Sequence, residues 1–157
     1  MTEDEQKALE ELRAGVDVSK FSNKPYIRRI EKNWGHELHF VPDGLPYMGK
    51  MLYLNEGKRS SLQAHDRKQE SWYWGGGDPV LLIENSDGDM QEIHLQEGEG
   101  YTCMIGQKHR LMGGKGGGVF IEVSTPEDGN TFRIEDDYNR PTETEQDREK
   151  RNQDGKN

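Results

Sequence analysis

The sequence has a single cysteine, Cys103, and few hydrophobic residues, which make up 30% of its 157 positions. One cysteine excludes a disulfide within the chain, so the sequence is not that of a disulfide-stabilised secreted scaffold. No apolar run approaches the roughly 18 residues of a membrane-spanning helix, and no hydrophobic core of a signal peptide is present. We therefore expect a cytoplasmic protein with no membrane partner.

Positive charge is also scarce. The chain has 21 Lys and Arg against 30 Asp and Glu, which gives a net charge of −9. Proteins that bind nucleic acid need a basic face that replaces counterions, so we expect no nucleic-acid partner. Hydrophobic residues are absent from positions 140 to 157. Such a stretch cannot recover by burial the entropy lost on ordering, and it predicts a disordered polar tail over residues 141–157.

The first 20 residues differ in pattern from the segment that follows. They predict a helical extension, with a helix over 3–14, because Thr2 can cap it and Gly15 can end it. Residues 21–140 predict one domain of short strands separated by turn residues. The candidate strands are Tyr26–Ile30, Glu37–Val41, Lys50–Asn55, Ser60–Ala64, Glu70–Trp74, Val80–Asn85, Met90–Leu95, Gly100–Ile105, Gly118–Ser124 and Thr131–Glu135. We expect an all-β, double-stranded jelly-roll barrel.

Two glycine runs, 75–77 and 113–118, are interpreted as connections between these strands. The second run has the composition of a phosphate-binding loop, but neither a Lys-Ser pair nor a helix follows it. We interpret it as a flexible hairpin connection.

Four polar residues have the spacing of a metal site in a barrel. Gln63 and His65 are two positions apart, so on a strand they face the same side. Glu70 follows after a predicted turn, and His109 comes from a separate hairpin. Imidazole and carboxylate suit zinc, iron, manganese, nickel or cobalt, and fewer than six protein ligands leave positions open for substrate. We predict that Gln63, His65, Glu70 and His109 bind a divalent metal, and we do not include His36, His39 or His94.

The same residues resemble the two motifs of the cupins. The first motif is followed in outline by Gly57, His65, Glu70 and Gly77. The second has a methionine in place of its proline and is followed by Gly98, Met104, Gly106 and His109. The resemblance implies the cupin barrel as the fold and a metal held between the two motifs.

Four segments resemble one branch of the cupins, the type II mannose-6-phosphate isomerase domain that is also fused to mannose-1-phosphate guanylyltransferases. In order, they are Lys32–Glu37, Ser61–His65 with Glu70, Lys108–Arg110, and Ile121–Pro126 followed by Arg133–Arg140. The resemblance covers roughly residues 26 to 140. It implies a cytoplasmic enzyme that interconverts mannose-6-phosphate and fructose-6-phosphate, with zinc as the first expectation for its metal, and a homodimer.

The chain departs from this pattern at two positions. Arg67 stands where the first motif has its second histidine, and a guanidinium cannot bind a metal. Asn33 replaces a proline in a loop. The site would then have three strong ligands, with Gln63 as a fourth, as in the glutamine-x-histidine arrangement of related zinc-dependent isomerases.

An aldose–ketose isomerase needs a base, a cation for the phosphate and a metal that polarises the carbonyl. The candidates for the first two roles are Arg110, Lys50 and Glu37. Arg110 and His109 face opposite sides of a regular strand, so Arg110 reaches the pocket only if the strand bends. Two alternatives remain: a non-catalytic cupin that binds a sugar or another small ligand, which Arg67 favours, and a metal-dependent dioxygenase.

Overall fold

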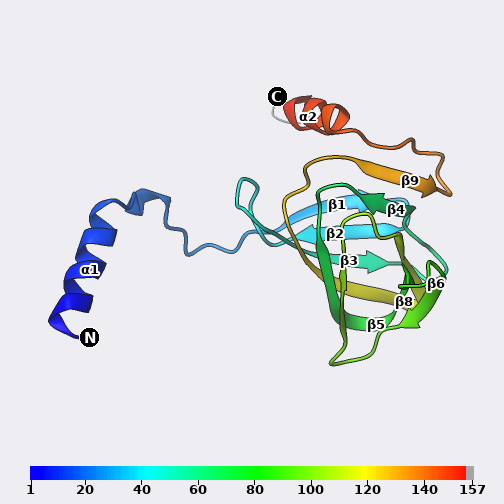
Figure 1. The fold of residues 1–157 in the computed structure, drawn as a ribbon, viewed down its shortest axis with the longest axis horizontal. Helices are drawn as coiled ribbons and strands as arrows, with labels where there is room; N and C mark the ends of the chain where they lie inside the picture. The colour runs from blue at the N-terminus through cyan, green and yellow to red at the C-terminus, as the bar shows by residue number, and fades with distance from the viewer. Residues whose placement is uncertain (155–157) are drawn as a thin grey trace.

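The computed structural model describes residues 1–154 and has an antiparallel sheet curled into a barrel, as Figure 1 shows. The expected all-β jelly roll is confirmed. The strands are β1 (Arg28–Lys32), β2 (Gly35–His39), β3 (Met48–Leu54), β4 (Leu62–His65), β5 (Glu70–Glu84), β6 (Met90–His94), β7 (Gly100–Cys103), β8 (His109–Ser124) and β9 (Thr131–Glu135). The helices are α1 (Glu3–Ala14), a 3₁₀ turn (Val18–Lys20) and α2 (Glu145–Asp154).

The strands pair in the order β1-β2-β3-β8-β4-β9, and β5 pairs with β6, β7 and β8. Strand β8 is therefore the centre of the barrel, because it contacts β3, β4 and β5 along its length. Its first residue lies opposite Gln63 of β4 and Ile83 of β5. This pairing places the start of β8 beside the end of β4, where two of the predicted ligands lie.

The glycine runs lie inside the two longest strands, which corrects their interpretation as connections. Gly77 of β5 pairs with Gly118 of β8, and the register shifts on both sides of Gly77 before pairing resumes at Pro79. A Cβ atom on Gly118 would collide with the backbone of Pro79, so only glycine permits this approach of the strands. The predicted strands Glu70–Trp74 and Val80–Asn85 are consequently two halves of β5.

A hydrophobic core fills one part of the barrel and leaves another part polar. The buried core residues are Trp34, Leu52, Leu54, Trp72, Leu81, Ile83, Leu95, Cys103, Leu111 and Phe120. Alternation directs Leu52 of β3 and its register partner Phe120 of β8 inward, and the same alternation buries the register partners Lys50 and Glu122. The polar region is the one that holds the candidate site.

The two helices lie on different sides of the molecule in Figure 1. Helix α1 has the expected bounds and a capping box between Thr2 and Glu5; it has no buried residue and extends away from the barrel. Helix α2 lies beside the barrel near β9. The sequence predicted a disordered tail from residue 141, but Glu145–Asp154 forms a helix and Arg148 is buried. Residues 155–157 of that prediction lie outside the described residues. No described helix is long and apolar enough to cross a membrane.

Candidate metal centre

Three of the predicted ligands converge in the barrel. His65 ends β4, Glu70 begins β5 and His109 begins β8. All three side chains are buried, and each offers one ligand atom within 4.8 Å of the others. In detail, Glu70 Oε2 lies 3.0 Å from Nε2 of His109 and 3.4 Å from Nε2 of His65.

The hydrogen bonds around this group fit a cation. Nδ1 of His109 lies 3.1 Å from the carbonyl oxygen of Gln107, and Nδ1 of His65 lies 3.2 Å from Oγ1 of Thr131. Protons on Nδ1 would leave both Nε2 lone pairs directed at Glu70, whose Oε2 is buried without a hydrogen bond among the described residues. A positive charge between the three converging acceptors would stabilise all of them. The residues therefore fit a divalent metal.

Gln63 lies at the same point but with its amide nitrogen inward. Nε2 of Gln63 is 3.3 Å from Nε2 of His65 and 3.4 Å from Nε2 of His109, while its Oε1 accepts a hydrogen bond from Ser61. A turn of the amide about its last bond would direct Oε1 at the metal position. The Ser61 hydroxyl can then accept instead of donate, so the turn leaves no polar atom unpaired.

The charges of the group follow from its burial and its neighbours. Burial alone would raise the pKa of Glu70, but Lys68 and the two imidazoles outweigh it and hold this pKa well below its usual range. Burial likewise disfavours a charged His109, yet contacts with Cys103 and Glu70 raise its pKa to about 10. Without a metal, a proton therefore supplies the positive charge that Glu70 requires.

The group opens onto a cavity of about 830 Å³ with a row of buried charges on its wall. Lys68 binds Glu70 Oε1 and lies 3.0 Å from Glu122, which also accepts a hydrogen bond from Trp72. Lys50 lies 3.6 Å from Glu122 and 3.1 Å from Glu127. These residues form a continuous row from the metal group across β5, β8 and β3.

The far end of the row contains Glu37 and His39 of β2. Glu37 lies 3.7 Å from Lys50, and its Oε2 is 2.8 Å from Nε2 of His39. Burial opposes the ionisation of Glu37, but Lys50, His39 and Lys32 outweigh it and lower its pKa to about 2. Burial also opposes a charged Lys50, yet the surrounding carboxylates raise its pKa well above the usual value. Glu37 and Lys50 are therefore a fixed anion and a fixed cation.

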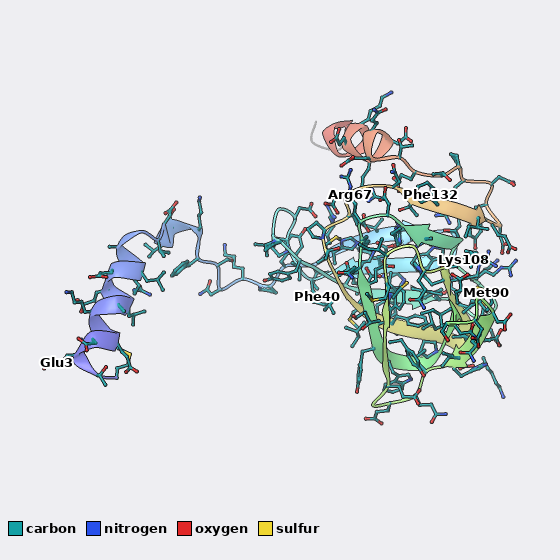
Figure 2. All side chains as sticks on the ribbon, viewed as in Figure 1. Glu3, Phe40, Arg67, Met90, Lys108 and Phe132 are labelled. Atoms are coloured by element: carbon teal, nitrogen blue, oxygen red, sulfur yellow. The ribbon has the colours of Figure 1, made fainter. Side chains whose placement is uncertain are left out.

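Two arginines highlighted by the sequence lie away from the cavity. Arg110 is buried, but its guanidinium binds the side-chain and backbone oxygens of Glu135 and does not line the cavity. Strand β8 does not bend at this point, so alternation directs Arg110 away from His109. Arg67 forms an ion pair of 2.6 Å with Glu145 on the surface, and Figure 2 shows it beneath α2.

The polar cavity residues that sequence reasoning missed include His39, Lys68, Glu122 and Glu127. His39 was not included with the ligands, and the structure makes it a partner of Glu37 instead. The positions of His39 and Glu122 could be inferred once the register was known. His39 pairs with Lys50, Lys50 with Glu122, and Glu122 with Trp72, so their side chains share the inner face.

No protein-family model matches the sequence, and no curated protein matches it. Solved structures do match. Oxalate decarboxylase from Bacillus subtilis at pH 4.6 has a TM-score of 0.60 and 17% identity, covering 73% of this chain and 33% of its own. The formate complex of Lactobacillus farciminis oxalate decarboxylase has a TM-score of 0.56 and 17% identity, covering 69% and 33%.

The chain thus spans about a third of the length of these solved structures. Identity this low indicates a shared fold and leaves the activity open. The curled antiparallel sheet is consistent with this likeness, and the buried His65, Glu70 and His109 side chains lie together. The chain has the cupin fold.

Proposed function

We propose that this protein is a metal-dependent enzyme that isomerises a small sugar phosphate, with mannose-6-phosphate and fructose-6-phosphate as the leading pair. The observation that carries the proposal is the convergence of Gln63, His65, Glu70 and His109 on one wall of a polar cavity. Zinc is the first expectation for the metal, and manganese, iron, nickel or cobalt suit the same ligands. The resemblance of four segments to the mannose-6-phosphate isomerase branch supports the choice of substrate.

The four ligands, His39, Glu37 and Lys50 each have a role in this proposal. A divalent metal bound at the four ligands would polarise the substrate carbonyl and acidify the adjacent carbon. His39 is the group that accepts and returns the proton, because its imidazole lines the cavity and Glu37 holds its Nε2. Glu37 orients His39 and is too weak a base, with its pKa near 2, to take the proton itself. Lys50 remains an ammonium and donates hydrogen bonds to substrate oxygens.

The phosphate requires cations that are more exposed than Lys50, which is buried among Glu37, Glu122 and Glu127. More exposed cationic side chains also line the cavity, and arginine matches phosphate with two parallel hydrogen bonds. They are Arg28, Arg29, Lys32, Arg133 and Arg140. We therefore assign the phosphate to these side chains, in place of Lys50 and Arg110, which the sequence alone favoured.

The direct test combines metal analysis with a coupled assay. We expect purified protein to hold about one divalent metal per chain and, when loaded, to convert mannose-6-phosphate to fructose-6-phosphate. His39→Gln should lower kcat by about 10²–10⁴-fold while the bound metal is unchanged. Lack of turnover by metal-loaded protein would exclude the isomerase. Thermal shifts with sugars in that case would favour the non-catalytic, ligand-binding alternative.

A second candidate is decarboxylation of a small dicarboxylate. It is favoured by the fold shared with oxalate decarboxylases and by the cationic side chains in the cavity. Formate production from oxalate by the metal-loaded protein would identify it. Oxygen uptake with ferrous iron would instead indicate the metal-dependent dioxygenase.

A further inference from the structure

Helix α2 docks on the barrel without a hydrophobic side chain. Its sequence has no apolar residue, yet Arg148 at its centre is 5% exposed. The N-terminus of the helix is held by polar contacts: Oδ1 of Asn130 accepts the backbone N–H of Glu145, and Asn130 in turn binds Asp66 beside His65. Burying a guanidinium is costly unless it is hydrogen-bonded and paired with an anion. Arg148 meets this requirement through partners on the barrel and in the segment just before α2.

Arg148 connects the helix to a metal ligand through one hydroxyl. Nη2 of Arg148 donates to Oγ1 of Thr131 at 2.8 Å, and the same oxygen lies 3.2 Å from Nδ1 of His65. Thr131 is buried and is the register partner of His65 across β4 and β9. Its backbone also forms two hydrogen bonds with Glu143, just before α2. The position of the hydroxyl is thus fixed from both sides.

The chemistry of Arg148, Thr131 and His65 determines which of them donates and which accepts each hydrogen bond. His65 can bind a metal through Nε2 when Nδ1 carries the ring proton, and that proton needs an acceptor. Arginine can only donate, so its hydrogen bond uses one lone pair of Oγ1 and leaves the second for His65. The hydroxyl of Thr131 is therefore available as an acceptor at the point where the metal-binding form of His65 has its N–H.

We propose that α2 is part of the metal centre: Arg148 positions Thr131, and Thr131 orients His65 for the metal. The inference rests on the metal site of the proposed function, and it assigns positioning roles to two residues outside the ligand set. It also explains Arg67, which replaces the second motif histidine. The Arg67–Glu145 ion pair holds the start of α2 at the surface (Figure 2).

The test measures the affinity of the full chain for Zn²⁺ by competition with a chelator. Thr131→Val keeps the shape of the side chain but removes the acceptor, and we expect about 10–100-fold weaker binding; Thr131→Ser should retain the wild-type affinity. Arg148→Gln should weaken binding in the same direction. Arg13→Gln on α1 is the matched control, since α1 has no buried residue and extends away from the barrel, and it should leave the affinity unchanged. Circular dichroism checks that each variant is folded.

The double variant separates positioning from simple docking of the helix. If Arg148 acts through Thr131, adding Arg148→Gln to Thr131→Val should cause little further loss of Zn²⁺ affinity. A full additive loss, or unchanged affinity in both single variants, would overturn the proposal. Nitrogen NMR of the Zn²⁺ form adds a direct readout, because the Nδ1 proton of His65 should be hydrogen-bonded in wild type and in Thr131→Ser only. Failure of the wild type to bind Zn²⁺ would overturn the metal site and this inference together, whereas binding that ignores Thr131 and Arg148 would overturn the inference alone.

Discussion

At the residue scale, we expect the four predicted ligands to contribute unequally to metal binding. His65 has its Nε2 directed at Glu70, while Gln63 must turn its amide before an oxygen can reach the metal. We expect His65→Ala to abolish metal retention through dialysis, and Gln63→Ala to weaken it by about 10–100-fold. Elemental analysis of metal per chain measures both effects.

The control for this pair is His36→Ala. His36 stacks on Tyr53 outside the metal group, so its loss removes an imidazole and should leave the metal content unchanged. A His65→Ala protein that keeps its metal, beside a Gln63→Ala protein that loses it, would contradict this ranking of the two ligands.

How far these residues could be predicted depends on how local their contacts are. The spacing of Gln63 and His65 on one strand, with Glu70 after a turn, was sufficient to identify them as neighbours. Alternation also warned that Arg110 would face away from His109, and it does. The contact of Lys68 with Glu122 joins residues 54 positions apart. No pattern in the sequence shows such a contact before the register of β5 and β8 is known.

At the scale of elements, the bends of β5 and β8 depend on glycine. Because a Cβ on Gly118 would collide with the backbone of Pro79, and backbone cannot move aside as a flexible side chain does, we expect Gly118→Ala to destabilise the barrel by about 3 kcal/mol or more. Urea unfolding followed by tryptophan fluorescence measures the change. Gly15→Ala is the control, since its new Cβ would make only an ordinary contact and should change stability by less than about 0.5 kcal/mol. Equal stability of the two variants would show that the strands can separate at the bend.

The composition of helix α2 led to a wrong prediction of disorder, although the sequence did contain a signal for the start of a helix. Thr144 and Asp147 exchange hydrogen bonds in the manner of a capping box, and this spacing could be read from the sequence. The lack of apolar residues argued for disorder, because ordering then gains nothing from hydrophobic burial. In the structure, polar contacts of Glu145 and Arg148 with the barrel replace that burial. Their partners, Asn130 and Thr131, precede the helix by about one strand and a loop and have no sequence signature.

At the scale of the whole molecule, the buried charges of the cavity should make the free energy of unfolding decrease as the pH falls into the acid range. Lys50 is the strongest of the neighbours that lower the pKa of Glu37, against the opposing effect of burial. A carboxyl whose pKa is lower in the folded state stabilises the fold above its unfolded pKa, near 4.5, and loses this contribution as the pH falls toward 2. For Glu37 the contribution at neutral pH is on the order of 3 kcal/mol.

Glu37→Gln isolates this contribution, because glutamine keeps the shape of the side chain and cannot titrate. We expect the wild type to lose stability steeply between pH 4.5 and pH 2, and the variant to have a slope shallower by up to about 1.4 kcal/mol per pH unit. The free energy of unfolding from urea titrations at several pH values gives both slopes. Parallel slopes for the two proteins would mean that Glu37 has the same pKa folded and unfolded. That result would also remove the reason for regarding Glu37 as a fixed anion that orients His39, and would return it to consideration as the base.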